Sequence, residues 1–105
     1  MGAIGILEVV GLTAAIEGLD GMLKTADVEF MTWEKKLGGR LVTIIVRGEV
    51  SAVEAAVANG KSRAEKIGKV AAYAVIPRPH EEVMRMVDLS AKKLPITKSG
   101  EINAF

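Results

Sequence analysis

Two adjacent glycines, Gly38 and Gly39, stand between two stretches that have the patterns of β-strands. Before them, Val28–Glu34 alternates apolar and polar residues, as a half-buried strand does. After them, Leu41–Val46 is rich in β-branched residues, which is typical of a more deeply buried strand. Because glycine adopts positive φ at little cost, this arrangement predicts a hairpin with the glycines at its turn.

Apolar runs and helical periodicity place the other elements on either side of this hairpin. The runs Ala3–Val9 and Lys69–Ile76 predict a first and a last strand. Helices are expected over Leu12–Ala26 and about Ala52–Lys66, and a short third helix over Glu81–Leu89. The order strand–helix–strand–strand–helix–strand with a short C-terminal helix predicts an α+β, ferredoxin-like βαββαβ fold.

The two longer helices are expected to bury different kinds of side chain. In the first, residues at spacings of three and four predict an apolar face made of Leu12, Ala15, Ile16, Leu19, Met22 and Leu23. Gly18 and Gly21 weaken this helix and indicate a surface where another backbone packs closely. In the second, small side chains outline the buried face, namely Val53, Ala56, Val57, Gly60 and Ala64. Ser51, with Glu54 three residues later, has the pattern of a capping box.

The chain is more hydrophobic than a small domain with a polar surface should be. Half of its 105 residues are hydrophobic, and its mean hydropathy is +0.29. No stretch approaches the roughly 20 apolar residues of a membrane-spanning helix. The first residues also lack the basic start and the cleavage site of a signal peptide. The surplus of apolar side chains therefore favours self-association.

The composition excludes several function classes. A net charge of +1 and 4% aromatic residues argue against a nucleic-acid interface. With no cysteine and one histidine, His80, a metal centre or a thiol- or histidine-based nucleophilic site is not expected. No carboxylate pair has a spacing that indicates catalysis, although several acidic residues are available: Glu8, Glu17, Asp20, Glu49 and Glu54. We therefore expect no catalytic, cofactor or metal site, and no nucleic-acid or membrane partner.

Five segments together resemble a known family. They are Ala3–Glu8, Gly11–Glu17, Asp20–Lys24, Val42–Val50 and Val75–His80. In this order and at these spacings they resemble the single-domain, hexamer-forming shell proteins of bacterial microcompartments (BMC), such as those of propanediol- and ethanolamine-utilisation organelles. The resemblance implies a BMC shell domain over residues 3–87, in an organelle shell within the bacterial cytoplasm. It leaves a tail over residues 88–105 that is either mobile or docked on a neighbour.

The resemblance also implies partners and site residues. The chain would form a homohexameric tile that meets other hexamers and other shell proteins edge to edge, around enclosed enzymes. The hairpin would line a central pore for small polar or anionic metabolites, through Lys36, Leu37, Gly38, Gly39 and Arg40. The edge between hexamers would include Lys24, Asp27 and Arg78, with His80 beside it at a helix start.

One pore residue departs from the family pattern. Arg40 stands where close relatives carry a glycine, so it either takes ordinary dihedrals or strains the loop. It would also add positive charge at the pore mouth.

Two other functions stay open on the residues alone. One is a ferredoxin-like regulatory module that binds a metabolite or a nucleotide, and the other is an enzyme that uses the carboxylates named above. The glycine pair alone fits an ordinary turn, while Lys24 and Arg78 alone fit solvated surface positions. A tile should give hexamers and larger sheets without ligand, whereas a sensor should give dimers or trimers that respond to its metabolite.

Overall fold

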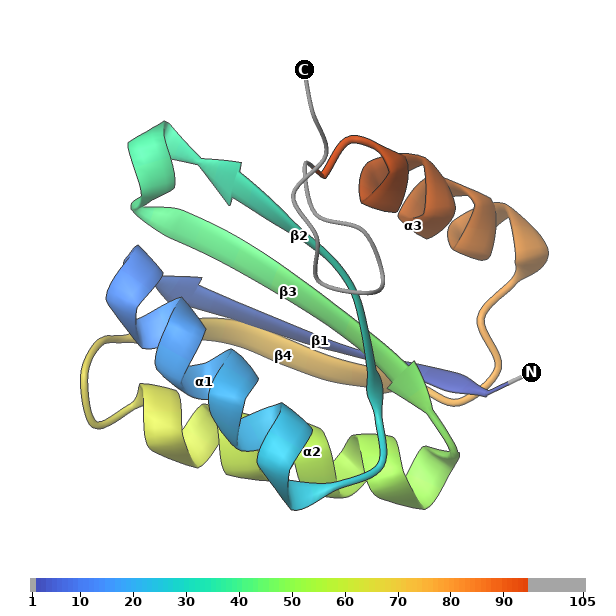
Figure 1. Cartoon of the computed structure of the whole chain (residues 1–105), viewed down its shortest axis with the longest axis horizontal. Coiled ribbons are helices and arrows are strands. Elements are labelled where there is room, and N and C mark those ends of the chain that lie inside the picture. The colour runs from blue at the N-terminus through green and yellow to red at the C-terminus, as the bar shows by residue number, and fades with distance from the viewer. Residues whose placement is uncertain (1, 95–105) are drawn as a thin grey trace.

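A four-stranded antiparallel sheet organises the computed structural model, which describes residues 2–94 (Figure 1). Its strands are β1 (Ala3–Val10), β2 (Glu29–Lys36), β3 (Leu41–Gly48) and β4 (Val70–Ile76). Their spatial order is β2-β3-β1-β4, so the hairpin strand β2 and the last strand β4 form the two edges. This order and the helical crossovers confirm the predicted α+β, ferredoxin-like class.

Two helices, α1 (Leu12–Thr25) and α2 (Val50–Ala64), cover one face of the sheet (Figure 1). The core lies between them and the sheet, and its large members are fully buried: Leu7, Val9, Met22, Val42, Ile44, Val46 and Val53. The third helix, α3 (Glu81–Lys92), packs against β2 on the other side. Within residues 2–94, none of the helices has the length and apolar character needed to cross a bilayer.

The buried face of α1 differs from the predicted one. The helix buries Ala14, Ala15, Gly18, Gly21 and Met22. Three large residues of the predicted face, Leu12, Ile16 and Leu23, are instead exposed by 37%, 52% and 44%. The prediction was therefore wrong for these three and right for Ala15 and Met22. The cause is the close approach of α2, which only the small side chains of α1 can accommodate.

The buried face of α2 is the predicted one, since Val53, Ala56, Val57, Gly60 and Ala64 are all buried. The predicted capping box does not form. The helix already begins at Val50, with Glu49 in the N-cap position and no side-chain cap hydrogen bond. Because Glu49 follows the last residue of β3 directly, the chain enters the helix before it reaches Ser51, which lies in the first turn.

The third helix begins where predicted but continues to Lys92 rather than ending at Leu89. His80 is its N-cap, and the His80 Nδ1 atom accepts a hydrogen bond of 3.0 Å from the Glu82 backbone N–H. The division into a shell domain over residues 3–87 and a tail over residues 88–105 stays a prediction. Residues 95–105 of that tail lie outside the described residues.

A polar chain fastens the C-terminal half of α3 to β2. Thr32 is fully buried, and its hydroxyl lies 2.8 Å from the Ser90 hydroxyl. Ser90 in turn donates to Glu34. Because the single hydroxyl proton of Ser90 goes to that carboxylate, Thr32 is the donor to Ser90. Val87 is the one buried apolar residue of this helix among the described residues.

Candidate functional site

The predicted hairpin joins β2 to β3, and its last pair is Lys36 with Leu41. Its turn is a short 3₁₀ segment, η1 (Leu37–Gly39), at one end of the sheet (Figure 1). All three turn residues have positive φ, which is 55° at Leu37, 68° at Gly38 and 91° at Gly39. A Cβ atom at either glycine would meet no atom within 4 Å. The tip is therefore an open stretch of backbone.

Arg40 takes ordinary right-handed dihedrals, with φ −75° and ψ −24°. The backbone strain expected as one possibility at Arg40 is therefore not found there. Leu37 is strained instead, because it is a non-glycine residue in the left-handed region, and its side chain is 71% exposed. The Arg40 carbonyl accepts a 2.7 Å hydrogen bond from the Gly11 N–H, at the junction of β1 and α1. The backbone of the hairpin tip is thus tied to a neighbouring turn.

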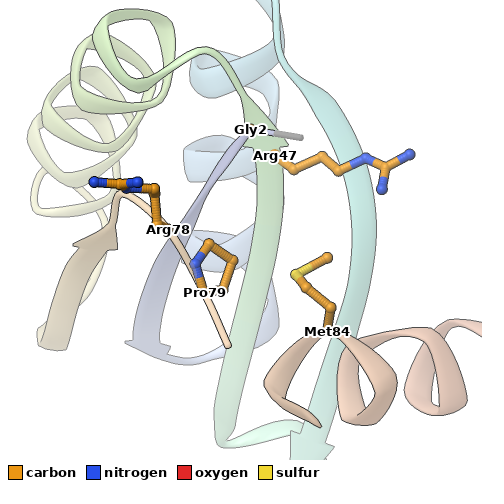
Figure 2. Close-up of a pocket in the computed structure, with 5 residues that line it drawn as sticks. All are labelled: Gly2, Arg47, Arg78, Pro79 and Met84. Atoms are coloured by element: carbon orange, nitrogen blue, oxygen red, sulfur yellow. The ribbon is translucent and has the colours of Figure 1, made fainter. Parts of the chain in front are cut away.

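The opposite end of the sheet holds most of the residues predicted for a tile edge. A pocket of about 540 Å³ is lined by Gly2, Arg47, Arg78, Pro79 and Met84 (Figure 2). In Figure 2 the guanidinium groups of Arg47 and Arg78 point away from each other. Asp27 lines a second pocket, of about 280 Å³, which shares Gly2 and Arg47 with the first. Asp27 and Arg78 therefore lie on adjoining hollows.

The other two predicted edge residues line neither pocket. Lys24 lies in the last turn of α1, where its ammonium group is 2.9 Å from the Asp20 carboxylate. His80 caps α3, two residues after Arg78. β3 runs from the hairpin to this end, and its eight residues span roughly 23 Å at about 3.3 Å per residue. The structure thus separates the predicted pore residues from the predicted edge residues along the sheet.

Ion pairs neutralise three of the five arginines. Arg47 pairs with Glu29, Arg85 pairs with Glu82, and Arg63 bridges Glu17 and Asp20. Within residues 2–94, the two arginines without a carboxylate partner are Arg40 at the hairpin and Arg78 at the opposite end.

Basic and hydroxyl side chains lie beside two of the acidic residues in the described chain, Asp20 and Glu8. The hydrogen bond from Lys24 is the largest effect on Asp20 and lowers its pKa, partial desolvation opposes it, and Arg63 lowers the pKa further. Glu8 accepts a 3.1 Å hydrogen bond from Thr43. Over the described part of the chain, no group of three or more His, Asp or Glu side chains is arranged to hold a metal ion.

Sequence reasoning missed a third pocket, beside the edge strand β2. Its volume is about 390 Å³, and it is lined by Leu19, Phe30, Trp33, Glu34, Lys35, Ser90, Lys93 and Leu94. The Phe30 and Trp33 rings meet edge to face at 6.2 Å between their centroids. Strict alternation would put Phe30 and Trp33 on opposite faces, but a bulge between Phe30 and Thr32 shifts the register and brings them together. Trp33, the single tryptophan of the sequence, was the available signal for this pocket.

Taken together, these observations define a small α+β module, with a four-stranded antiparallel sheet that carries two helices on one face. The sequence profile of the family described as the BMC domain matches residues 3–79. The chain belongs to this family and is a shell protein of a bacterial microcompartment.

Named relatives agree with this assignment. The chain is 49% identical over 85 residues to the bacterial microcompartment shell protein PduA of Citrobacter freundii. The match covers 81% of this chain and 90% of that protein. It is 41% identical over 92 residues to the shell protein EutM of Salmonella typhimurium, covering 88% of this chain and 95% of the relative. It is also 44% identical over 92 residues to the carboxysome shell protein CsoS1A of Hydrogenovibrio crunogenus. That match covers 86% of this chain and 94% of the relative.

A solved structure shares the fold. It is a microcompartment protein from Desulfitobacterium hafniense, with a TM-score of 0.73 and 29% sequence identity. The similarity covers 92% of this chain but 51% of the other, so the chain spans about half the length of that protein.

Proposed function

We propose that the chain closes into a cyclic homohexamer, a flat shell tile whose hairpin tips surround a central pore for small polar or anionic metabolites. The observation that carries this proposal is the presence of two different apolar surfaces at the two edges of the sheet. A contact between unlike surfaces repeats head to tail, and it closes into a ring when the rotation between copies allows.

The first surface lies on the β2 side. The outer face of α1 exposes Leu12, Ile16 and Leu23, and Trp33 is half-buried next to it in the pocket beside β2. Apolar side chains in this number on one side of a small domain favour burial against a partner.

The second surface lies on the β4 side. Ile67 and Tyr73 are exposed by 51% and 57%, and the small residues Ala71, Ala72 and Ala74 of β4 are exposed as well. Because β4 ends the sheet, its outer backbone groups are also unpaired within the described chain. The small side chains would let a neighbouring copy approach this edge closely.

The separation of the two predicted sites supports a wedge-shaped protomer. In a ring of such wedges, the hairpin end would face the axis and the end with Asp27 and Arg78 would face the rim. Lys24, Asp27, Arg78 and His80 would then contact neighbouring hexamers and other shell proteins, and the finished shell would enclose enzymes. Weak lateral contacts are enough to hold tiles together in a layer, because each tile makes several of them at once.

We also propose that the chain has no catalytic activity of its own. Its relatives are named as shell proteins. Three of the five candidate carboxylates are neutralised or hydrogen-bonded, Glu17 and Asp20 by Arg63 and Glu8 by Thr43.

Native mass spectrometry and negative-stain imaging of the purified protein test the assembly. We expect hexamers at micromolar concentration and extended sheets without any added ligand. A stable monomer at that concentration, or a dimer or trimer that changes with a metabolite, would overturn the proposal.

A further inference from the structure

We propose that Arg63 is a positioning residue for the tile edge: from α2 it fixes Asp20 of α1, and Asp20 in turn holds the ammonium group of Lys24 in place for contact with a neighbouring tile. This inference rests on the proposed function, because it concerns how the predicted edge residue Lys24 is held.

Arg63 reaches α1 at a position that has no side chain of its own. A Cβ atom on Gly21 would lie 2.7 Å from Arg63 Cδ and 3.3 Å from Arg63 Nε, so the arginine occupies the place of a side chain there. Asn59 of α2 borders the same place, since that Cβ would lie 2.8 Å from its Oδ1 atom. Arg63 therefore crosses from α2 to α1 over Gly21, and its side chain is only 28% exposed.

The guanidinium group of Arg63 bridges two carboxylates of α1. Its Nη2 atom lies 2.7 Å from Glu17 and 3.0 Å from Asp20, and its Nε donates to Glu17 at 2.8 Å. The planar fork of an arginine suits such a bridge, whereas a lysine presents a single point of charge. Because Arg63 is itself held by Glu17 and by the surface around Gly21, it gives the Asp20 carboxylate a fixed position.

Asp20 holds Lys24 in turn. The Lys24 ammonium lies 2.9 Å from the same Asp20 Oδ2 atom that Arg63 contacts. An isolated surface pair of this kind contributes little, but several charges joined in a network contribute more. A lysine ammonium has three N–H donors, so the pair with Asp20 leaves two of them for an outside acceptor. With its side chain 70% exposed, Lys24 therefore presents a donor group that is already in position for a partner.

This arrangement favours contact between tiles in two ways. A long side chain loses freedom when it forms a contact, and a lysine that is already held loses less. Charge acts in the same direction, because like charges that meet at an interface repel. The cluster has two cations and two carboxylates, so it brings no net charge to the meeting of two like edges; its members are Arg63, Lys24, Glu17 and Asp20.

The lowest protein concentration that gives sheets, measured by light scattering and negative-stain imaging, tests the inference. We expect Arg63→Gln to keep the hexamer mass and to raise this concentration about fivefold or more, because the loss repeats at several contacts of each tile. Asp20→Asn should act in the same way, and it decides the question if Arg63→Gln gives no hexamers. Gly60→Ala is the control, since it loosens the same helix contact without removing an ion pair and should leave the concentration unchanged.

The pH at which sheets dissolve gives a second measurement. Lys24 and Arg63 both lower the pKa of Asp20, and Glu17 shares Arg63 with it. Without Arg63 the pKa of Asp20 rises, so Asp20 loses its charge, and with it the ion pair to Lys24, at a higher pH. Sheets of Arg63→Gln should therefore dissolve at a higher pH than wild-type sheets. A role confined to packing between the helices would not shift this pH.

Lys24→Ala separates this inference from the proposed edge. If Lys24→Ala loses sheets while Arg63→Gln and Asp20→Asn assemble like the wild type, the inference is overturned and the edge stands. If Lys24→Ala assembles normally, the edge role of Lys24 and the inference both fail. Equal effects of Arg63→Gln and Gly60→Ala would show that the helix contact itself controls assembly, and they would also overturn the inference.

Discussion

Gly18 of α1 and Gly60 of α2 face each other closely, and the space is tighter for a side chain at Gly60 than for one at Gly18. A Cβ atom on Gly60 would lie 3.0 Å from the Gly18 carbonyl oxygen, and one on Gly18 would lie 3.3 Å from the Gly60 carbonyl oxygen. Helices without side chains at their crossing approach until their backbones touch. This contact turns the small face of α1 inward and its large apolar residues outward. The same two glycines that pack the helices together therefore leave the large apolar residues of α1 exposed.

Substitution of Gly60 by alanine should test this contact. Besides the carbonyl, the new Cβ would lie 2.7 Å from Met22 Cγ, so we expect Gly60→Ala to lower the free energy of unfolding by about 1–3 kcal/mol. Gly18→Ala is the matched control. Its nearest neighbour is the flexible end of Leu7 at 3.1 Å, and the gain in helix propensity, about 1 kcal/mol, offsets the crowding. Urea unfolding at one fixed protein concentration measures the stability of both variants. Equal stability of Gly60→Ala and wild type would contradict the prediction.

Local patterns were sufficient for most of the fold. The hairpin, the order of elements and the buried face of α2 were read correctly because each depends on residues close in sequence. The buried face of α1 was not, since a choice between Leu12 and Ala14 as inward positions depends on Gly60, more than 40 residues away. The bulge in β2 likewise left no signal in the alternation of Val28–Glu34.

Only part of the candidate site could be predicted from the sequence. A glycine pair between strands predicts a turn, but the left-handed backbone of Leu37 and the bond from Gly11 to Arg40 depend on contacts across the sheet. The family resemblance named Lys24 and Arg78, which no local pattern distinguishes from solvated residues. That both Arg40 and Arg78 lack an ion pair in the described chain emerged only from the structure.

The proposed pore should narrow when Gly39 carries a large side chain. Gly39→Leu should reduce metabolite flux across assembled shells, because six leucines would fill the axis. At φ 91° any L-residue is strained, by about 1–2 kcal/mol. Gly39→Ala shares this strain without the bulk, so it serves as the control and should reduce flux less. Unchanged flux in Gly39→Leu shells of normal appearance would argue against a transport path through the hairpins.

The predicted edge residues should affect sheets but not hexamers. Lys24→Ala removes one surface ion pair with Asp20, which contributes little to stability, about 0–1 kcal/mol. Arg78 has no ion pair to lose within residues 2–94. We therefore expect Lys24→Ala and Arg78→Ala to keep the hexamer mass and lose extended sheets under negative stain. Arg85→Ala removes a comparable surface ion pair on α3 and should keep both the hexamer mass and the extended sheets. Loss of the hexamer in both edge variants would place these residues on another interface.

Acid should weaken the contact between α1 and α2 through Asp20. Lys24 and Arg63 lower its pKa in the folded chain below the ordinary value of 3.8. A lowered folded pKa contributes stability above the unfolded value, and this contribution is lost as the pH falls through the folded pKa. Asp20→Asn should therefore be less stable than wild type near neutral pH, and the gap should close in strong acid. Urea midpoints of both proteins at about pH 7 and about pH 2 measure this difference in stability. A difference that does not depend on pH would contradict the prediction.

The polar chain from Thr32 through Ser90 to Glu34 should determine how firmly α3 is held. Ser90→Ala leaves the buried Thr32 hydroxyl with a single weak contact, 3.4 Å from the Trp33 carbonyl oxygen. An unsatisfied buried hydroxyl costs about 1–3 kcal/mol. Because α3 buries little else, we expect its backbone amides to exchange with solvent faster in Ser90→Ala, while those of β1 and β3 stay protected.

A double-mutant cycle with Thr32→Val separates the hydrogen bond from simple loss of packing. Valine keeps the shape of threonine and removes the hydroxyl, so no buried hydroxyl is left unsatisfied when Ser90 is also replaced. Thr32→Val combined with Ser90→Ala should therefore protect α3 better than Ser90→Ala alone, with a coupling energy of about 0.5–3 kcal/mol. If the two substitutions instead add, the hydroxyl pair does not hold the helix. Val87, the one buried side chain of α3 among the described residues, would then be its main attachment.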